Sequence, residues 1–367
     1  MVLHDYVWQG NVEAVRREIQ NGASIDAFDD RGFTPLMVAV YHDENRLSII
    51  RLLIELGADI HARGLLGTSA LDLAVSSGET EIAAFLLSAD PDLNRDGEYL
   101  ARAMRSATNE PIVKLLKSAG ASLEDMSTEM KRLWLGLKES DKWQIDKSDY
   151  LAGWKRRFGL ANPELLDMPF LNEMIRTGRS AYAAIEHFGS HPGIYRIPIW
   201  CFERFGMSFT ELPDGRVVQI GGEHEDFYMP DFCIYNEVVI HDRTGTFQVM
   251  GYPEEVFPPT DFHSATYVDG SIYIIGSLGY QDSRVVGLTP VRRLDCKSWR
   301  IETIQTSGDM PGWIYKHKAS YDGHGHILVS GGGVFHGDET AEVKPSTRGR
   351  HQLCLGNMEW TRTATQS

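Results

Sequence analysis

A cluster of acidic and imidazole side chains follows an apolar run in the second half of the chain. The run ends in a glycine pair, and the next residues include Glu223, His224, Glu225, Asp226 and Tyr228. Carboxylate and imidazole groups are metal ligands and also act as general acids and bases. Successive residues of an extended segment point to different sides, however, and no His-x-x-x-His or Cys-x-x-Cys spacing occurs nearby. We therefore expect a solvated or partner-binding loop without a metal, and keep metal or acid–base chemistry open as the alternative.

The rest of the chain has few residues with the spacing of known catalytic motifs. It contains no Walker loop, no Gly-x-Ser-x-Gly elbow and no dinucleotide fingerprint. His263 and His317 recur at matching places in a longer pattern, which favours a structural role for both. The four cysteines lie far apart and mostly in strand-like runs, as expected of buried thiols. We predict no catalytic residue and no cofactor.

The apolar run before the acidic cluster belongs to a repeat. Glycines of a turn recur at positions 215, 270 and 325, and glycines after the run recur at 221, 276 and 331, a step of 55 residues each time. A fixed period of this size indicates repeated structural units. In each unit a turn between apolar runs predicts a hairpin, and the continuous second run predicts a strand buried on both faces. A large ring follows in each unit, at Phe247, Trp299 and Trp360.

These units resemble kelch repeats, in which a glycine pair follows a hydrophobic strand and an aromatic residue lies in the fourth strand. Gly221 and Gly222 match the pair, whereas the second unit departs from it with Ser277. The resemblance implies about three four-stranded blades within residues 194–367. A closed propeller needs about four to eight blades, so we expect an open arrangement. Its exposed edges would be covered by residues 124–190 or paired in a homodimer.

The first third of the chain repeats at a shorter period. A Leu-Leu pair precedes three of its four repeated turns, and Thr34 and Pro35 have the types expected of a helix N-cap and first helical residue. This pattern predicts helix pairs that stack on one another. Steps of 35, 33 and 30 residues separate equivalent apolar positions, which are Ile25, Ile60, Leu93 and Leu123.

This region resembles ankyrin repeats, most closely over residues 30–36 and 56–60. The resemblance implies an α-solenoid of about four units over residues 1–123, with degenerate units at both ends. Ankyrin stacks bind proteins through hairpin tips and the concave helix face, which implies a partner-binding surface here. Together with the acidic cluster, the predicted partner-binding residues are Phe28, Arg31, Phe33, Tyr41, His42, Arg63, Leu65, Leu66, Arg95, Tyr99, Glu223, His224, Glu225, Asp226 and Tyr228.

Residues 124–193 have helical periodicity and many aromatic residues but no repeat, so we expect a helical bridge that docks on a repeat domain. Within it, residues 162–164 (Asn-Pro-Glu) have the types expected at the start of a helix. The predicted fold class is therefore multi-domain α+β. It comprises an ankyrin stack at 1–123, this helical bridge, and an all-β kelch-like region at 194–367.

Charge and hydropathy argue against several classes of partner. The net charge is −15, and counting Lys and Arg against Asp and Glu gives −7 for residues 1–123, −1 for 124–203 and −7 for 204–367. No segment is basic, which argues against nucleic acid and anionic membranes. A basic partner protein would be attracted, although acidic surfaces commonly serve solubility alone. No apolar run approaches the roughly 20 residues of a membrane span, and the first residues lack a signal-peptide pattern, so we expect a cytoplasmic protein.

We predict a non-catalytic protein-binding module that recognises its partner through ankyrin hairpin tips and kelch-like loops. Ankyrin proteins of this type include bacterial immunity proteins that neutralise toxins, and the combination of repeats resembles uncharacterised bacterial ankyrin/kelch proteins. The alternative is an enzyme, or a metal- or sugar-binding protein, with its site at the acidic cluster. A substrate adaptor of ubiquitin ligases ranks last, because residues 124–190 contain no recognisable adaptor domain.

Overall fold

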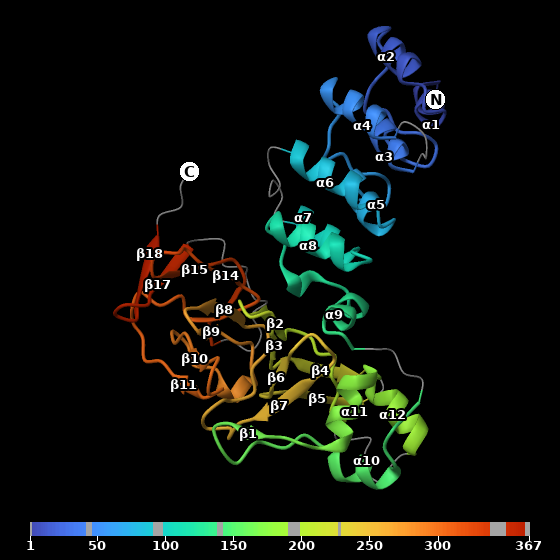
Figure 1. The fold of residues 1–367 in the computed structure, drawn as a ribbon. Coiled ribbons are helices and arrows are strands. Elements are labelled where there is room, and N and C mark those ends of the chain that lie inside the picture. The colour runs from blue at the N-terminus through green and yellow to red at the C-terminus, as the bar shows by residue number, and fades with distance from the viewer. Residues whose placement is uncertain are drawn as a thin grey trace. The chain divides into compact units, whose positions relative to one another are not determined.

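A computed structural model describes residues 2–41, 46–90, 98–137, 142–189, 199–226, 229–337 and 350–363. The chain divides into two compact units, Met1–Leu133 and Trp134–Ser367 (Figure 1). The first is helical and the second is built mainly of antiparallel sheets, which confirms the predicted fold class. The domain boundaries predicted at residues 123 and 193 stay predictions.

The first unit is a stack of helix pairs, as the short sequence period predicts. Within each pair the two helices contact each other, and α1, α3, α5 and α7 also contact one another in series. A short 3-10 helix, η1 (Leu123–Asp125), and α9 (Thr128–Trp134) follow. The pairs are α1 (Val2–Trp8) with α2 (Val12–Gln20), α3 (Pro35–Val40) with α4 (Arg46–Glu55), α5 (Ala70–Ser76) with α6 (Thr80–Ala89), and α7 (Tyr99–Arg105) with α8 (Glu110–Ser118).

Helix starts in this unit are fixed by side-chain caps. The Thr34 hydroxyl accepts a hydrogen bond from the backbone N–H of Met37, and Pro35 occupies the first turn of α3, so both predicted roles are confirmed. At α5, Ser69 and Asp72 form a reciprocal capping box, with N···O distances of 2.9 and 3.2 Å. Each cap satisfies backbone donors that a helix start would otherwise leave unpaired.

Buried leucines hold the helix pairs together. Leu53 and Leu86 have no exposed surface, and Leu52 is 2% exposed. Burying a leucine side chain stabilises the fold by about 1.5–3 kcal/mol. Because each pair buries these side chains against its neighbours, the stack rather than the single pair is the stable unit.

Among the described residues, the second unit contains three mainly antiparallel sheets whose strands follow one another along the chain, one sheet for each 55-residue repeat. An additional strand lies at the edge of the first and third sheets. The first sheet has β2 (Ser208–Glu211), β3 (Val217–Ile220), β6 (Val238–His241), β7 (Phe247–Gly251) and β1 (Glu164–Leu165). The second has β8 (Ser264–Val268), β9 (Ser271–Ile275), β10 (Val291–Asp295) and β11 (Ile301–Thr303), and the third has β14 (Lys318–Tyr321), β15 (His326–Ser330), β17 (Arg350–Cys354), β18 (Glu359–Thr363) and β12 (Ser307–Gly308).

Two short two-stranded sheets accompany the three larger ones among the described residues. They pair β4 (Glu223–Asp226) with β5 (Met229–Ile234), and β13 (Trp313–Tyr315) with β16 (Gly333–Phe335). A 3-10 turn, η3 (Gln281–Ser283), lies between β9 and β10.

Apolar residues on facing sheets form two cores. The core between the first and second sheets includes Val218, Ile240 and Ile274, and the core between the second and third includes Ile275 and Val329. The first strands of the sheets, β2, β8 and β14, contact one another in series. The three sheets therefore stack like neighbouring blades, and among the described residues they do not close into a propeller.

The recurring histidines connect each sheet to the one before it. His263 Nε2 lies 2.9 Å from the hydroxyl oxygen of Ser208 in β2, and His317 Nε2 lies 2.9 Å from that of Ser264 in β8. Each histidine directly precedes a strand, and both are buried. The first repeat has Met207 in place of the histidine before its first strand, β2. The third repeat has Lys318 in place of the serine that begins its first strand, β14. The histidine–serine contact is therefore limited to the two junctions between the three sheets.

One face of the third sheet is more exposed than the faces of the other two sheets. Residues of β15 alternate between buried and exposed, and Leu328 is 36% exposed. The prediction that this strand is covered on both faces is therefore wrong. Its neighbours on the exposed face include Lys318 and Ser320. An antiparallel sheet can leave such a face in contact with water.

Segment 155–166 covers edges of two sheets, which agrees with the prediction that residues 124–190 protect them. β1 pairs with β7, the last strand of the first repeat. At the second sheet, the Asn162 side chain donates to Ile301 O (2.7 Å) and accepts from Ile301 N (2.9 Å). Residues 162–164 do not begin a helix, contrary to the sequence-based expectation, because they bond to sheet edges instead.

Helices α10 (Lys147–Gly153), α11 (Pro169–Thr177) and α12 (Ala181–Phe188) lie together (Figure 1). Aromatic rings pack between them. The ring of Tyr150 stacks on Phe188 with centroids 4.9 Å apart, and Phe170 meets Tyr150 edge-on at 5.4 Å. This packing orders the segment predicted as a helical bridge. None of the helices within the described residues is both long and apolar enough to cross a membrane.

Candidate functional site

Two hairpin tips of the first unit share the same backbone geometry, one repeat apart. In the first, Asp29 N donates to Phe33 O at 2.9 Å, and in the second, Gly64 N donates to Thr68 O at 2.9 Å. A glycine with positive φ closes each turn. The outermost positions are therefore residues 30–31 in the first tip and residues 65–66 in the second.

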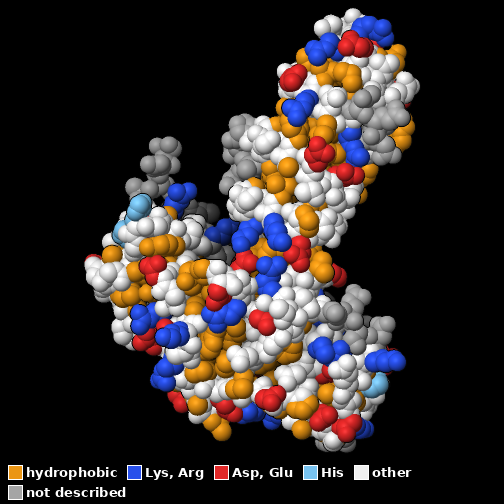
Figure 2. Space-filling view, viewed as in Figure 1, with side chains coloured by type: hydrophobic (Ala, Val, Ile, Leu, Met, Phe, Trp, Pro, Cys, Tyr) orange, Lys and Arg blue, Asp and Glu red, His pale blue; other side chains and the backbone are white. Residues whose placement is uncertain are grey.

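The second tip presents two leucines to solvent. Leu65 is 80% exposed and Leu66 is 92% exposed, and Phe28, before the first tip, is 57% exposed. Leu65 rests on the backbone of Gly32 in the neighbouring tip, where a Cβ atom would have no room. Both leucines remain largely in water, so neither stabilises the core. Figure 2 shows such hydrophobic side chains interspersed with charged ones over the helical unit.

Charged groups at the first tip are paired locally. Arg31 lies 3.2 Å from the Asp29 carboxylate, and the backbone N–H groups of Arg31 and Phe33 also donate to that carboxylate. Partial burial alone would raise the pKa of Asp29, but these hydrogen bonds and the Arg31 guanidinium lower it overall. Asp29 therefore serves the turn.

Two arginines fix the second tip. Arg63 Nη1 donates to the carbonyl of Gly67 at 3.2 Å, and Arg102 donates to the same carbonyl. Sequence reasoning did not identify Arg102. It lies 35 residues from Gly67, so the spacing of one repeat was the only signal that could have related the two.

Other predicted residues of this unit lie in different surroundings. Tyr41 is 45% exposed, with its ring centroid 6.1 Å from that of the half-buried Phe33. Tyr99 is only 1% exposed and packs on His61, with ring centroids 4.7 Å apart. Burial, assisted by nearby carboxylates, raises the pKa of Tyr99. Its side chain does not reach the surface formed by the tips, and the predicted residues His42 and Arg95 lie outside the described part of the chain.

In the second unit, the acidic cluster forms part of the hairpin β4–β5 instead of a loop. Glu223 and His224 are half-buried and succeed each other in a strand, so their side chains diverge. The side chains of Glu225 and Asp226 and the whole of Tyr228 lie outside the described residues. Within the described residues, no group of three or more His, Cys, Asp or Glu side chains could hold a metal ion.

Glu223 lies close to Asp261, in the loop before β8. Asp261 is fully buried and accepts hydrogen bonds from Gly279 N (2.6 Å) and Ser277 Oγ (3.2 Å). Burial raises the pKa of Asp261 although these donors act in the opposite direction.

Comparisons with known proteins concern the ankyrin region. The family model described as ankyrin repeats (3 copies) matches residues 2–64. The chain is 33% identical over 123 residues to protein phosphatase 1 regulatory subunit 27 of Mus musculus, which covers 33% of this chain and 77% of that protein. It is 39% identical over 89 residues to ankyrin repeat and SOCS box protein 3 of Bos taurus, covering 23% of this chain but 17% of the relative.

A third relative is the inactive serine/threonine-protein kinase TEX14 of Bos taurus, 34% identical over 96 residues, or 26% of this chain and 6% of that protein. The chain thus spans only small parts of the two longer relatives. The family model leaves the β region unassigned. The helix pairs have capped starts, two hairpin tips share equivalent backbone hydrogen bonds, and the match covers most of one related protein. This chain therefore belongs to the ankyrin-repeat family through its N-terminal region.

Proposed function

We propose that this protein binds a partner protein through its hairpin tips, with Leu65 and Leu66 as the apolar contact. The observation that carries the proposal is the exposure of these neighbouring side chains, 80% and 92%, on a turn whose backbone is held by other groups. Apolar side chains that stabilise no core and lie on a rigid tip are suited to a protein interface. Covering one of them would contribute about 1.5–3 kcal/mol before the losses of association are subtracted.

The surrounding surface extends this contact. Phe28 and Tyr41 add exposed rings, and Arg31 contributes a side chain 63% exposed. Tyr99 is left out of the proposed surface because it is buried. Because Arg31 and Asp29 pair with each other, the groups left for contact with a partner are mainly apolar. The proposal therefore depends on hydrophobic contact, and a basic partner stays a prediction.

A photo-crosslinking experiment tests the proposal. The photoreactive residue p-benzoylphenylalanine would replace Leu66 in one version of the full chain and Gln20, on α2, in the other. Irradiation in native lysate should give one discrete adduct from position 66 that excess unlabelled protein suppresses, and none from position 20. Equal adducts from both positions, or no competed adduct from position 66, would contradict the proposal.

A second measurement uses substitutions. Leu65→Ser/Leu66→Ser should weaken binding of the crosslinked partner at least about tenfold without changing the unfolding midpoint, because neither side chain is in the core. Leu160→Ser is the matched control, since Leu160 is 86% exposed and lies in the other unit. An unchanged affinity in the double variant would refute the proposed contact.

The role of the complex is a further part of the proposal. One relative is named as a regulatory subunit of a protein phosphatase, and an inhibitor or immunity protein that occludes its target would use the same kind of surface.

We also propose that the three stacked sheets are a kelch-like second surface. A cytoplasmic location is supported by the four cysteines, which are all free thiols. Light scattering would test the predicted homodimer, which the covered outer edges do not favour.

A further inference from the structure

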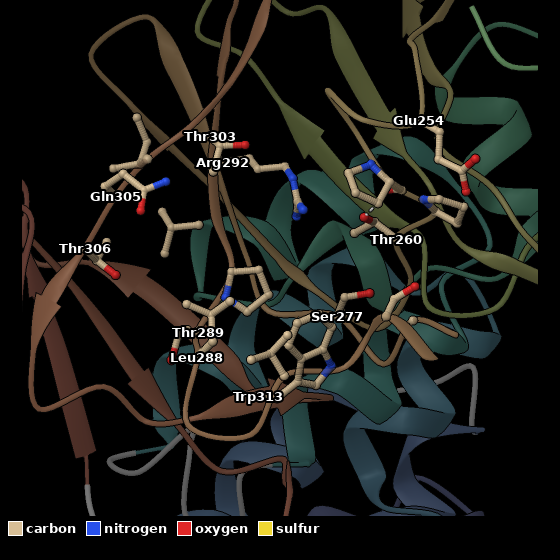
Figure 3. A pocket seen from close by; sticks show the side chains of 18 residues that line it. Glu254, Thr260, Ser277, Leu288, Thr289, Arg292, Thr303, Gln305, Thr306 and Trp313 are labelled. Atoms are coloured by element: carbon tan, nitrogen blue, oxygen red, sulfur yellow. Dashed lines mark hydrogen bonds between the residues drawn. The ribbon is translucent and has the colours of Figure 1, made fainter. Parts of the chain in front are cut away.

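A pocket opens within the second unit, independent of the hairpin tips. Its volume is about 390 Å³, and it lies among the loop before β8, the loop after β9, and strands β10 and β11. Pockets of this size accommodate small organic ligands. Figure 3 shows the lining, with Arg292 extending toward the middle and Trp313 on the opposite side.

Arg292 is the cation of this pocket. It lies on β10 beside Arg293, and successive residues of a strand face opposite sides. Arg293 pairs with Glu302, whereas the Arg292 guanidinium faces the first sheet, 5.9 Å from the centroid of the Phe257 ring. In the sequence, two adjacent arginines lie within a strand whose faces are both covered by sheets. Because side chains alternate along a strand, one of the two must face the space between the first and second sheets.

No carboxylate compensates the charge of Arg292 among the described residues. Its Nε atom is buried without a hydrogen-bond partner, and no ion pair of its guanidinium occurs there. Burial lowers the pKa of Arg292 to about 10, so it is still protonated at neutral pH. A buried charge without a partner destabilises a fold, and an anion placed beside it removes that penalty.

The acidic side chain that lines the pocket does not serve as this anion. Glu254 is exposed, lies apart from Arg292 in Figure 3 and forms no ion pair with it. A solvated carboxylate at a rim repels ligands weakly, because water and salt screen it. Arg292 therefore dominates the electrostatics of the interior.

The other lining residues indicate the body of the ligand. Apolar walls come from Pro258, Pro290, Val291, Ile304 and the ring of Trp313, whose indole nitrogen is already committed to Leu278 O at 3.2 Å. A hydroxyl group of the lining also has a hydrogen-bond partner within the protein, because Thr289 donates to Gly312 O at 2.7 Å. Such walls favour carbon-rich groups over a highly hydroxylated ligand.

We propose that this pocket binds a small organic anion, with its carboxylate or phosphate group on the Arg292 guanidinium and its carbon body against Trp313 and the prolines. Arginine suits this role because its planar fork donates two parallel hydrogen bonds to such anions. The site is separate from the ankyrin tips and does not depend on the function proposed for them.

Four probes with one ring and different charges test the proposal, namely benzoate, phenyl phosphate, neutral benzamide and cationic benzylammonium. Their binding to the ¹⁵N-labelled full chain would be followed through the Arg292 Nε–H signal, identified by its absence in Arg292→Gln. One or both anions should shift this signal at concentrations where benzamide and benzylammonium do not. Preference between benzoate and phenyl phosphate would identify the anionic group that the site favours.

Matched variants separate the charge from the fold. Arg292→Gln should weaken anion binding about 10- to 100-fold, the range for a charge-assisted hydrogen bond, whereas Arg293→Gln should leave it unchanged. Binding in Arg292→Gln and Arg293→Gln is read from other backbone signals of the pocket, such as that of Ser277.

A third variant keeps the test decisive if Arg292→Gln fails to fold. Thr303 is the cross-strand partner of Arg292 and also lines the pocket, so the carboxylate of Thr303→Glu would pair with the guanidinium and exclude the probes. Equal binding of benzoate and benzamide, unshifted signals with both anions, or wild-type affinity in Thr303→Glu would each overturn the proposal.

Discussion

Acid should destabilise the β region through the two histidines that connect its sheets. His263 and His317 are 8% and 7% exposed, and the Nδ1 atom of each is buried without a hydrogen-bond partner among the described residues. Burial lowers the pKa of His263 to about 3 and that of His317 to about 4. In the unfolded chain a histidine titrates near pH 6.5. Both side chains are therefore neutral in the folded protein throughout the mildly acidic range.

The direction and size of the effect follow from proton binding. Between about pH 6.5 and pH 4 the unfolded chain binds more protons than the folded chain, so the free energy of unfolding falls as the pH falls. For a pKa of about 3 or 4 in the folded state, each histidine lowers this free energy by about 2 kcal/mol between pH 7 and pH 5. The two together should lower it by about 4 kcal/mol if they act independently.

Hydrogen-exchange mass spectrometry of the full chain can measure this loss in peptides that span β8 and β14. We expect His263→Gln to reduce the pH-dependent loss of protection by about 2 kcal/mol, because glutamine can retain a polar contact but does not titrate. His324→Gln is the control, since His324 is exposed at a turn. If His263→Gln and His317→Gln both lost as much protection as the wild type between pH 7 and pH 5, the assignment of acid sensitivity to these residues would be refuted.

Two further predictions concern stability of the same unit. Gly221→Ala should lower the unfolding free energy by about 2–5 kcal/mol, because Gly221 has a φ of +56° and a Cβ there would collide with Thr260 O. Gly215→Ala is the control and should lower it by about 1–2 kcal/mol, because Gly215 also has a positive φ, +86°, but has open space around it. Equal losses in urea denaturation would contradict this explanation. Arg204→Met should cost about 3–5 kcal/mol by leaving the buried Glu237 carboxylate without its partner at 3.0 Å, and Arg204→Met/Glu237→Met should cost less than the sum of the single changes. Strict additivity of the single losses would exclude a coupled pair.

Features that depend on neighbours in sequence were predictable from the chain. The N-cap at Thr34 and the turns at Gly215 and Gly270 need only residues a few positions apart, and the structure contains all three. The 55-residue period likewise predicted one sheet for each repeat, because an apolar strand and its turn recur together. The exposure of Leu65 and Leu66 was also foreseeable, since two leucines within a glycine-flanked turn have no helix face to cover.

Features that depend on distant parts of the chain were decided by tertiary structure alone. Asn162 has the neighbours of a helix start, yet its side chain bonds to Ile301, 139 residues away, and the segment becomes an edge strand instead. Tyr99 looked like a surface residue, but His61 from the preceding repeat covers it. The difference has one physical origin. Local hydrogen bonds and side-chain periodicity are set by the order of the residues, whereas burial and charge pairing, such as the isolation of Arg292, depend on which surfaces the folded chain brings together.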